Sequence, residues 1–423
     1  MRRPPSNLAS GAVVLGLATL VASASNYALN VILGRWLGPA AFGEVALMLT
    51  LLMLSTVITT SVQLVTAKTV AEAASDGERS AAIVHVRRRA GRVALVVAGV
   101  VVLVSPALAS ALQVRQPLAV IVMAVGLPVH LRLAVDRGIL QGDLRLGRVA
   151  ASFVAEAAAR IGSSVVFVLL GWGVVGATIG LNLAFVGGLA MTVARTRVGA
   201  SGSLTADQAT RLRAAGRQVS VLLVATTIIN NGDVVAAKFF LDPSTAGRYA
   251  AIALVGRAIF FLSWSAQQAV VPVAARSRRH QDAKSTFEIG SVIVTAVMAF
   301  GTAGVVWVLH EPLVEAAFGA EYVPLAGLLG PYAVATACWA VANVIVSIEV
   351  SRGQRTGAVL AAAAAVVQTV AVMAAGSSAG RMVTAQVWVM AALLVAVVGA
   401  PAIARRLTAR LSGAERMTVG ATA

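Results

Sequence analysis

The chain has 423 residues, of which 58% are hydrophobic and 12% are charged, and its mean hydropathy is +0.86. These values lie outside the range of soluble domains and indicate a protein that crosses a membrane several times. The single cysteine excludes an intrachain disulfide, and the four histidines are too scattered for metal-ligand spacing, so we expect neither a metal nor a cofactor. The net charge of +17 is spread over loops between apolar stretches, which argues against nucleic-acid binding.

Twelve apolar stretches are long enough to cross a membrane as helices, and none has the alternating pattern of a barrel strand. In the first half they cover residues 8–34, 43–67, 93–113, 117–140, 149–170 and 174–194. In the second half they cover residues 218–240, 246–274, 288–309, 322–349, 356–376 and 381–404. The sequence therefore predicts an all-α polytopic membrane protein with about twelve transmembrane helices.

The segments that connect these stretches alternate in charge. Every second connection is basic, and these connections and the two termini hold 26 of the 34 lysines and arginines. Because positive residues near helix ends stay in the cytoplasm, the pattern places both termini there, together with the segments 68–92 and 195–217, which we expect to be polar linkers. The basic segments also predict contact with anionic lipid headgroups.

The two halves of the chain share a short repeat. With an offset of 204 residues, Leu37–Gly43 and Leu241–Gly247 both read Leu-x-Pro-x-x-x-Gly. Proline ends one helix and pre-shapes the next, and glycine allows close packing beside the turn. Because six helices separate the copies, the repeat is parallel, about an axis along the membrane normal. We expect an N-terminal lobe at 1–194, a basic cytoplasmic linker at 195–217, a C-terminal lobe at 218–404 and a basic cytoplasmic tail at 405–423.

Two segments carry a family resemblance. Residues 30–44 read NVILGRWLGPAAFGE, and residues 137–148 read RGILQGDLRLGR. They resemble the first-hairpin signature and the Gln-Gly segment of Wzx-type polysaccharide flippases, which belong to the multidrug/oligosaccharidyl-lipid/polysaccharide exporter (MOP) superfamily. The resemblance implies a MATE-like, V-shaped pair of six-helix lobes, whose central cavity alternately faces the cytoplasm and the outside.

The same resemblance implies a function and its partners. The cargo would be a polyprenyl-pyrophosphate-linked oligosaccharide or polysaccharide precursor, flipped from the cytoplasmic to the outer leaflet. The composition, rich in Ala, Val, Arg and Gly, indicates a bacterial source, so we expect the plasma membrane of a bacterium. The polymerase and the glycosyltransferases of the same pathway are further expected partners.

Two other functions remain open. An ion-coupled multidrug exporter would share the fold, but a cation exporter would favour carboxylates, whereas these spans hold more basic residues than acids. A membrane polymerase or glycosyltransferase acting on lipid-linked sugar would need a sizeable external loop with catalytic acids, and the longest one, 310–321, is short. The sequence holds no phosphate-binding loop, nucleophile elbow or zinc motif, so we expect no enzyme.

Ionisable residues inside the spans are costly and mark functional candidates. Arg132 and Asp136 lie four residues apart in the fourth span, with Arg137 beside them, and Glu156 and Arg160 repeat this spacing in the fifth. Each pair lies on one helix face, so it is either an ion pair that only stabilises the bundle or part of a phosphate site. In the second reading the three arginines bind pyrophosphate, because the planar guanidinium makes bidentate bonds to phosphate oxygens. The two acids then take part in coupling.

Asp233 and Arg257 lie at similar depth in the seventh and eighth spans. We expect an Asp–Arg pair, which is either structural or a switch in which Arg257 binds phosphate and Asp233 takes up a proton. Amides within the spans are weaker candidates, because amides in lipid often only hydrogen-bond across helices. The candidates for contact with sugar hydroxyls are the repeat-matched amides Asn26 with Asn230 and Gln63 with Gln267.

Overall fold

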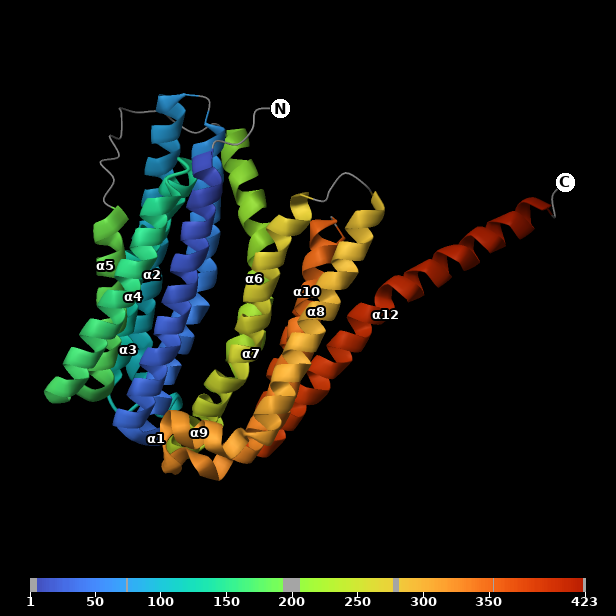
Figure 1. Cartoon of the computed structure of the whole chain (residues 1–423). Helices are drawn as coiled ribbons and strands as arrows, with labels where there is room; N and C mark the ends of the chain where they lie inside the picture. The colour runs from blue at the N-terminus through green and yellow to red at the C-terminus, as the bar shows by residue number, and fades with distance from the viewer. Residues whose placement is uncertain (1–5, 74, 193–205, 277–280, 353, 421–423) are drawn as a thin grey trace. The chain divides into compact units, whose positions relative to one another are not determined.

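The structure is a computed structural model of the chain (Figure 1), and it describes residues 6–73, 75–192, 206–276, 281–352 and 354–420. Side chains are described for residues 11, 13–73, 75–192, 223–261, 288–350, 352 and 354–399. The described residues form helices joined by short turns and include no strand, so the predicted all-α class is confirmed.

The helices follow one another with little intervening chain. The first group consists of α1 (Ser6–Glu72), α2 (Asp76–Ala111), α3 (Pro117–Gly142), α4 (Leu146–Phe167), a π-helical turn (Val168–Trp172), α5 (Gly173–Thr192), α6 (Ala206–Phe240) and α7 (Pro243–Arg276). The second group consists of α8 (Gln281–Val308), α9 (His310–Phe318), a 3-10 segment (Ala320–Leu328), α10 (Leu329–Ser351), α11 (Thr356–Ala374) and α12 (Ala379–Gly420). Each of the twelve predicted spans overlaps these helical segments over most of its length.

Within the described residues, eight helical stretches are long and apolar enough to cross a membrane. Two of them, Val13–Glu72 and Leu146–Thr192, each contain two of the predicted spans, because the helices join through a kink or a π-helical turn. The multi-span architecture is thus confirmed, and the count of twelve crossings stays a prediction.

The prediction of a linker at 68–92 is wrong. α1 continues to Glu72, and α2 begins at Asp76 with Ser75 as its cap. The Ser75 hydroxyl accepts a hydrogen bond from the backbone N–H of Glu78 at 3.2 Å, and Asp76 and Glu78 place negative charge at the positive end of the helix. Helix α6 likewise begins at Ala206, inside the predicted linker 195–217, whose residues up to 205 lie outside the described part of the chain.

The chain groups into two compact units, which are described separately. The first comprises residues 1–251 and 314–324, and the second comprises residues 252–313 and 325–423. In the first unit α1 packs against α3, α4 and α6, and in the second α10 packs against α8, α11 and α12 (Figure 1). An apolar core joins α1, α2 and α3 through Val70, Ile83, Ala90, Ala94, Leu131, Val135 and Ile139. The predicted lobes 1–194 and 218–404 stay a prediction.

The two copies of the repeated turn lie against each other within the first unit. Gly38, with φ of 70°, breaks α1 immediately before Pro39. A Cβ atom on Gly43 would lie 3.0 Å from the Cα of Gly247, and a Cβ atom on Gly247 would overlap the carbonyl oxygen of Pro39. The predicted role of glycine, close packing beside this turn, is confirmed.

Asp242 caps the N-terminus of α7 and makes its stability depend on pH. Its Oδ1 accepts hydrogen bonds from the backbone N–H groups of Thr245 and Ser244, each at 3.1 Å. The hydrogen bonds from Thr245, and then that from Ser244, lower the pKa of Asp242 below its ordinary value of 3.8. Because this pKa is lower in the folded state, the stabilisation is complete above about pH 5 and is lost as the pH falls through the folded pKa.

We expect Asp242→Ala to lower the free energy of unfolding by about 1 kcal/mol at pH 7. Asp242→Asn keeps an acceptor for the two N–H groups, so it should retain most of the stability at pH 7 and remove the contribution of this cap to the loss of stability in acid. Thermal unfolding of the purified protein in detergent between pH 3 and 7 measures both effects. Equal midpoints for Asp242→Ala and wild type at neutral pH would contradict the assigned cap.

Candidate functional site: a charged network in the first unit

Both predicted intrahelical pairs form in the first unit. On α3, Nε of Arg132 lies 3.0 Å from Oδ2 of Asp136, and on α4, Nη2 of Arg160 pairs with Oε1 of Glu156. Each pair spans one turn of its helix, as the four-residue spacing requires. Neither pair is isolated, however, because each acid also binds an arginine from elsewhere in the unit.

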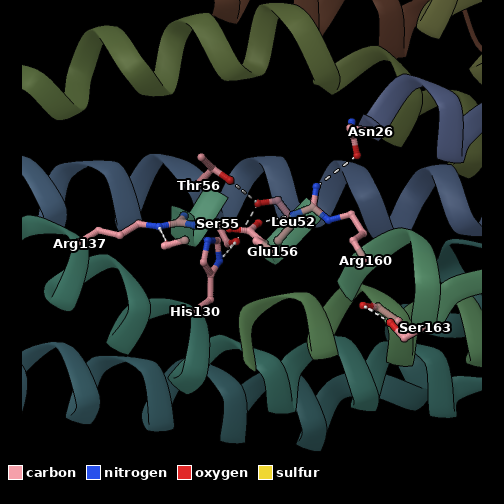
Figure 2. A network of polar contacts seen from close by, with 11 residues as sticks. Asn26, Leu52, Ser55, Thr56, His130, Arg137, Glu156, Arg160 and Ser163 are labelled. Atoms are coloured by element: carbon pink, nitrogen blue, oxygen red, sulfur yellow. Dashed lines mark hydrogen bonds and ion pairs between the residues drawn. The ribbon is translucent and has the colours of Figure 1, made fainter. Parts of the chain in front are cut away.

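Glu156 is held between two arginines (Figure 2). Its second oxygen, Oε2, lies 2.7 Å from Nη2 of Arg137, whose Nε donates to the hydroxyl of Ser152 at 2.7 Å. The guanidinium carbon of Arg137 stands 3.8 Å above the centre of the Phe153 ring. The side chains of Arg137, Glu156 and Arg160 are only 7%, 12% and 12% exposed. The three residues therefore place one net positive charge inside the helix bundle.

Two further polar side chains join this network from neighbouring helices (Figure 2). Asn26 on α1 accepts a hydrogen bond from Nη1 of Arg160 at 3.3 Å. His130 on α3 is buried, with Nδ1 3.3 Å from the hydroxyl of Ser55 on α1. The imidazole stacks on Phe185 of α5, with ring centres 4.1 Å apart and planes inclined by 5°. The network thus draws side chains from α1, α3, α4 and α5.

Asp136 also binds two arginines. Besides Arg132 on its own helix, its Oδ1 lies 2.7 Å from Nη2 of Arg87 on α2. Asp136 is buried, whereas the Arg132 side chain is 49% exposed. Glu156 and Asp136 are therefore each paired with two arginines. The whole region carries an excess of positive charge.

The Gln-Gly segment of α3 has a packing role. A Cβ atom on Gly138 would lie 2.5 Å from the carbonyl oxygen of Gln63, and one on Gly142 would lie 2.7 Å from that of Ala67. Small residues four apart let two helix backbones approach closely in a membrane. The Gln63 amide donates to Oε1 of Gln141 at 3.0 Å, so this candidate side chain fastens α1 to α3.

The remaining predicted residues lie outside the network. Asp233 accepts a hydrogen bond from the Tyr249 hydroxyl at 3.2 Å, in the first unit. Arg257, in the second unit, donates through Nε to the carbonyl oxygen of Ala253 at 2.9 Å. Pairing of Asp233 with Arg257 stays a prediction. Asn230 donates to Thr226 on its own helix, and the side chain of Gln267 lies outside the described residues.

Arg87, Ser152 and His130 were not among the residues predicted from the sequence. Ser152 could have been found, because it precedes Glu156 by one helical turn and therefore shares its face. His130 lies two turns before Arg137 on α3, a spacing that also predicts a shared face. Arg87 was not considered as a candidate because it was assigned to the predicted linker 68–92. In the structure it lies on helix α2.

The arrangement suits the binding of an anion. Arginine has five N–H donors, and Nε of Arg160 is buried without a hydrogen-bond partner in the described part of the chain. Two guanidinium groups that share one carboxylate can also donate hydrogen bonds to phosphate oxygens, which accept them in the same bidentate geometry as a carboxylate. Burial strengthens such contacts, because water does not compete for the donors.

The comparisons with known proteins agree with the helical architecture. The model of a family described as polysaccharide biosynthesis protein matches residues 8–278, and no curated protein matches the chain. An inward-facing multidrug resistance MATE family transporter of the MOP superfamily has a TM-score of 0.72 and 14% identity, over 94% of this chain and 98% of that one. The lipid II flippase MurJ has a TM-score of 0.72 and 12% identity, over 91% and 87% of the two chains.

A third solved structure is similar to this chain over most of its length. It is a MOP superfamily transporter from Pyrococcus furiosus, with a TM-score of 0.59 and 14% identity over 92% of this chain and 93% of that one. It is described as having a binding pocket of reversed polarity that suggests a different function. At these identities the three similarities show a shared fold.

Proposed function

Because this chain belongs to the polysaccharide biosynthesis protein family and has the fold of the MOP transporters, we propose that it is a flippase for lipid-linked glycans. Its substrate would be a polyprenyl-pyrophosphate-linked oligosaccharide or polysaccharide precursor. The protein would move this substrate from the cytoplasmic to the outer leaflet of a bacterial plasma membrane, with both termini in the cytoplasm. The similarity in fold to a lipid II flippase supports this class of substrate.

The observation that carries the proposal is the sharing of Glu156 by Arg137 and Arg160. One guanidinium is enough to neutralise the buried carboxylate. The second guanidinium therefore leaves an unbalanced positive charge in a transmembrane bundle, which a bound anion would neutralise. A pyrophosphate group supplies two negative charges and several acceptor oxygens, and it would displace the carboxylate from one or both arginines. Arg132, and Arg257 in the second unit, are the further arginines that we assign to the headgroup.

The proposed transport cycle follows from the two chemical parts of the substrate, a charged headgroup with its sugars and an apolar polyprenyl tail. The charged headgroup and its sugars enter the protein, where Asn26, Asn230, Gln63 and Gln267 contact sugar hydroxyls, while the polyprenyl tail stays in lipid. Rocking of one helix bundle against the other then exposes the headgroup to the outside. We assign coupling to the carboxylates Glu156, Asp136 and Asp233.

The same proposal covers the partners of the protein. The exposed arginines of α2, of the α3–α4 turn and of the first turn of α4 would contact anionic lipids, and they include Arg88, Arg89, Arg92, Arg145 and Arg148. The polymerase and the glycosyltransferases of the same pathway would supply and consume the flipped precursor.

An ion-coupled multidrug exporter is the second candidate, because multidrug MATE transporters share the fold. A site for organic cations needs surplus carboxylate, and the network around Glu156 and Asp136 has surplus guanidinium instead. The charge of the site therefore favours the flippase.

Reconstituted liposomes test the proposed function. A fluorescent polyprenyl-pyrophosphate glycan is placed in the membrane, and its loss of protection from an impermeant quencher reports flipping. Arg137→Lys and Arg160→Lys retain the charge but lose the planar fork, so we expect flipping to fall about tenfold, the equivalent of one charge-assisted hydrogen bond. Arg79→Lys, at a partly exposed pair with Asp143, is the control and should flip at the wild-type rate.

Two outcomes would reject the proposed function. The first is wild-type flipping in both Arg137→Lys and Arg160→Lys. The second is transport of ethidium-type cations by a protein that moves no glycan, which would assign the chain to the multidrug branch and make Asp233 the next residue to test.

A further inference from the structure

His130 is a buried titratable group that the proposed transport cycle leaves without a role. It lies on α3, is 8% exposed, and forms a face-to-face stack with Phe185. A histidine that served only to fill space at this position would need no polar neighbours. Its ring instead contacts the Ser55 hydroxyl and stands beside the Arg137–Glu156–Arg160 cluster (Figure 2).

The hydrogen bonds of Ser55 define the tautomer of His130. The single hydroxyl proton of Ser55 is donated to the carbonyl oxygen of Leu52 at 2.7 Å. The 3.3 Å contact between this hydroxyl and Nδ1 of His130 therefore requires the imidazole to donate. Nδ1 carries the proton, and Nε2 is left with a lone pair that can accept a second proton.

The charges around the ring determine when that second proton binds. His130 interacts electrostatically with Arg137 on its own helix and with Glu156 and Arg160 on α4. The contacting groups on α1 and α5, Ser55 and Phe185, are uncharged. Burial removes the ring from water, which is the main cost of an imidazolium here, and the carboxylate that opposes this cost is shared by two guanidinium groups while no anion is bound.

A bound diphosphate reverses this balance. It adds two negative charges next to the arginines and also pulls them away from Glu156, which frees the carboxylate to attract a cation. Both changes favour protonation of Nε2. Because coupling between two ligands is reciprocal, protonation of Nε2 must in turn favour binding of the diphosphate.

We propose that His130 is a proton-binding site linked to the anion site at Arg137 and Arg160, so that a diphosphate headgroup binds together with one proton, taken from water onto Nε2. This inference rests on the proposed function, since it needs a diphosphate at those arginines. Release of the headgroup returns the proton to water, and no other bond is made or broken. The affinity for the headgroup therefore rises as the pH falls.

Calorimetry on the full-length protein in nanodiscs tests the linkage. The probe is dimethyl diphosphate, a diester that remains a dianion across pH 6–8 and so adds no titration of its own. We expect binding about tenfold tighter at pH 6 than at pH 8, within the usual range of coupling between two sites. Titrations at pH 6 in buffers of different ionisation enthalpy should show an uptake approaching one proton for each anion bound, and at pH 8 an uptake close to zero.

The variants separate His130 from other sources of pH dependence. His130→Asn places an amide nitrogen where Nδ1 donates to Ser55, so it retains that hydrogen bond but cannot titrate. We expect it to bind the probe with the same affinity at pH 6 and pH 8 and without proton uptake. His85→Asn, at an exposed histidine of α2, is the matched control and should behave as wild type.

A direct measurement keeps the test valid if His130→Asn folds poorly. Nitrogen chemical shifts of wild-type protein labelled at histidine should show His130 as the Nδ1–H tautomer without ligand and doubly protonated with the probe at pH 6.5. Binding without proton uptake, or uptake that persists in a folded His130→Asn protein, overturns the linkage and leaves the flippase intact. Failure of wild type to bind the probe at any pH overturns the anion site itself, and the linkage with it.

Discussion

Glu156→Gln is expected to lower the free energy of unfolding by about 3–5 kcal/mol, the usual effect of removing one partner of a buried ion pair. The neutral amide leaves Arg137 and Arg160 buried, close together and without a counter-charge. The two guanidinium groups then repel each other in a medium that screens charge poorly. The midpoint of thermal unfolding in detergent, compared with that of wild type, gives the size of the effect.

The same variant reports on anion binding. If phosphate oxygens can replace the carboxylate, added dimethyl diphosphate should raise the unfolding midpoint of Glu156→Gln more than that of wild type. Asp143→Asn is the matched control, because its pair with Arg79 at 2.8 Å is partly exposed and should contribute about 1 kcal/mol or less. Equal stability of Glu156→Gln and Asp143→Asn would contradict the central position that we give to Glu156.

Gly247→Ala should destabilise the protein by about 3 kcal/mol, at the upper end of the range for overpacked sites. The new methyl group would lie 2.5 Å from the carbonyl carbon of Pro39. Backbone on the opposite side cannot rotate away as a side chain can, so the two repeated turns must separate. We expect a lower unfolding midpoint and a lower yield of folded protein.

A second glycine provides the control for this substitution. Gly232 lies inside α6, where the nearest neighbour of an added Cβ atom is the Ile228 side chain at 3.6 Å. Because alanine favours helix over glycine by up to about 1 kcal/mol, Gly232→Ala should be neutral or stabilising. A Gly247→Ala protein as stable as Gly232→Ala would show that the turns do not need their close contact.

The fold could be predicted from the sequence because its signals are local. Hydropathy marks the spans, and a four-residue spacing is enough to pair Arg132 with Asp136. A capping box from Ser75 to Glu78 was present as well, and it would have predicted that α2 begins well before the apolar stretch. The linker prediction failed because hydropathy finds the part of a helix inside lipid and not the helix end beyond it.

The candidate site could be predicted only in part. Contacts within one helix follow from spacing, whereas the bond from Arg137 to Glu156 depends on how α3 and α4 are rotated about their axes. A helix that is apolar on most sides carries little sequence information about that rotation. For the same reason, the stack of His130 on Phe185 and the contact of Arg87 with Asp136 had to await the structure.

Gly43 and Gly247 hold the same position in the two copies of the repeated turn, and these two positions are in contact. In an assembly of two identical subunits, only a residue beside the twofold axis touches its own counterpart. Gly43 and Gly247 occupy equivalent positions of the repeat, 204 residues apart, so a twofold axis that related the two copies of the turn would pass beside them. A side chain at either position would meet the backbone of the other copy of the turn, so the contact requires glycine in both copies.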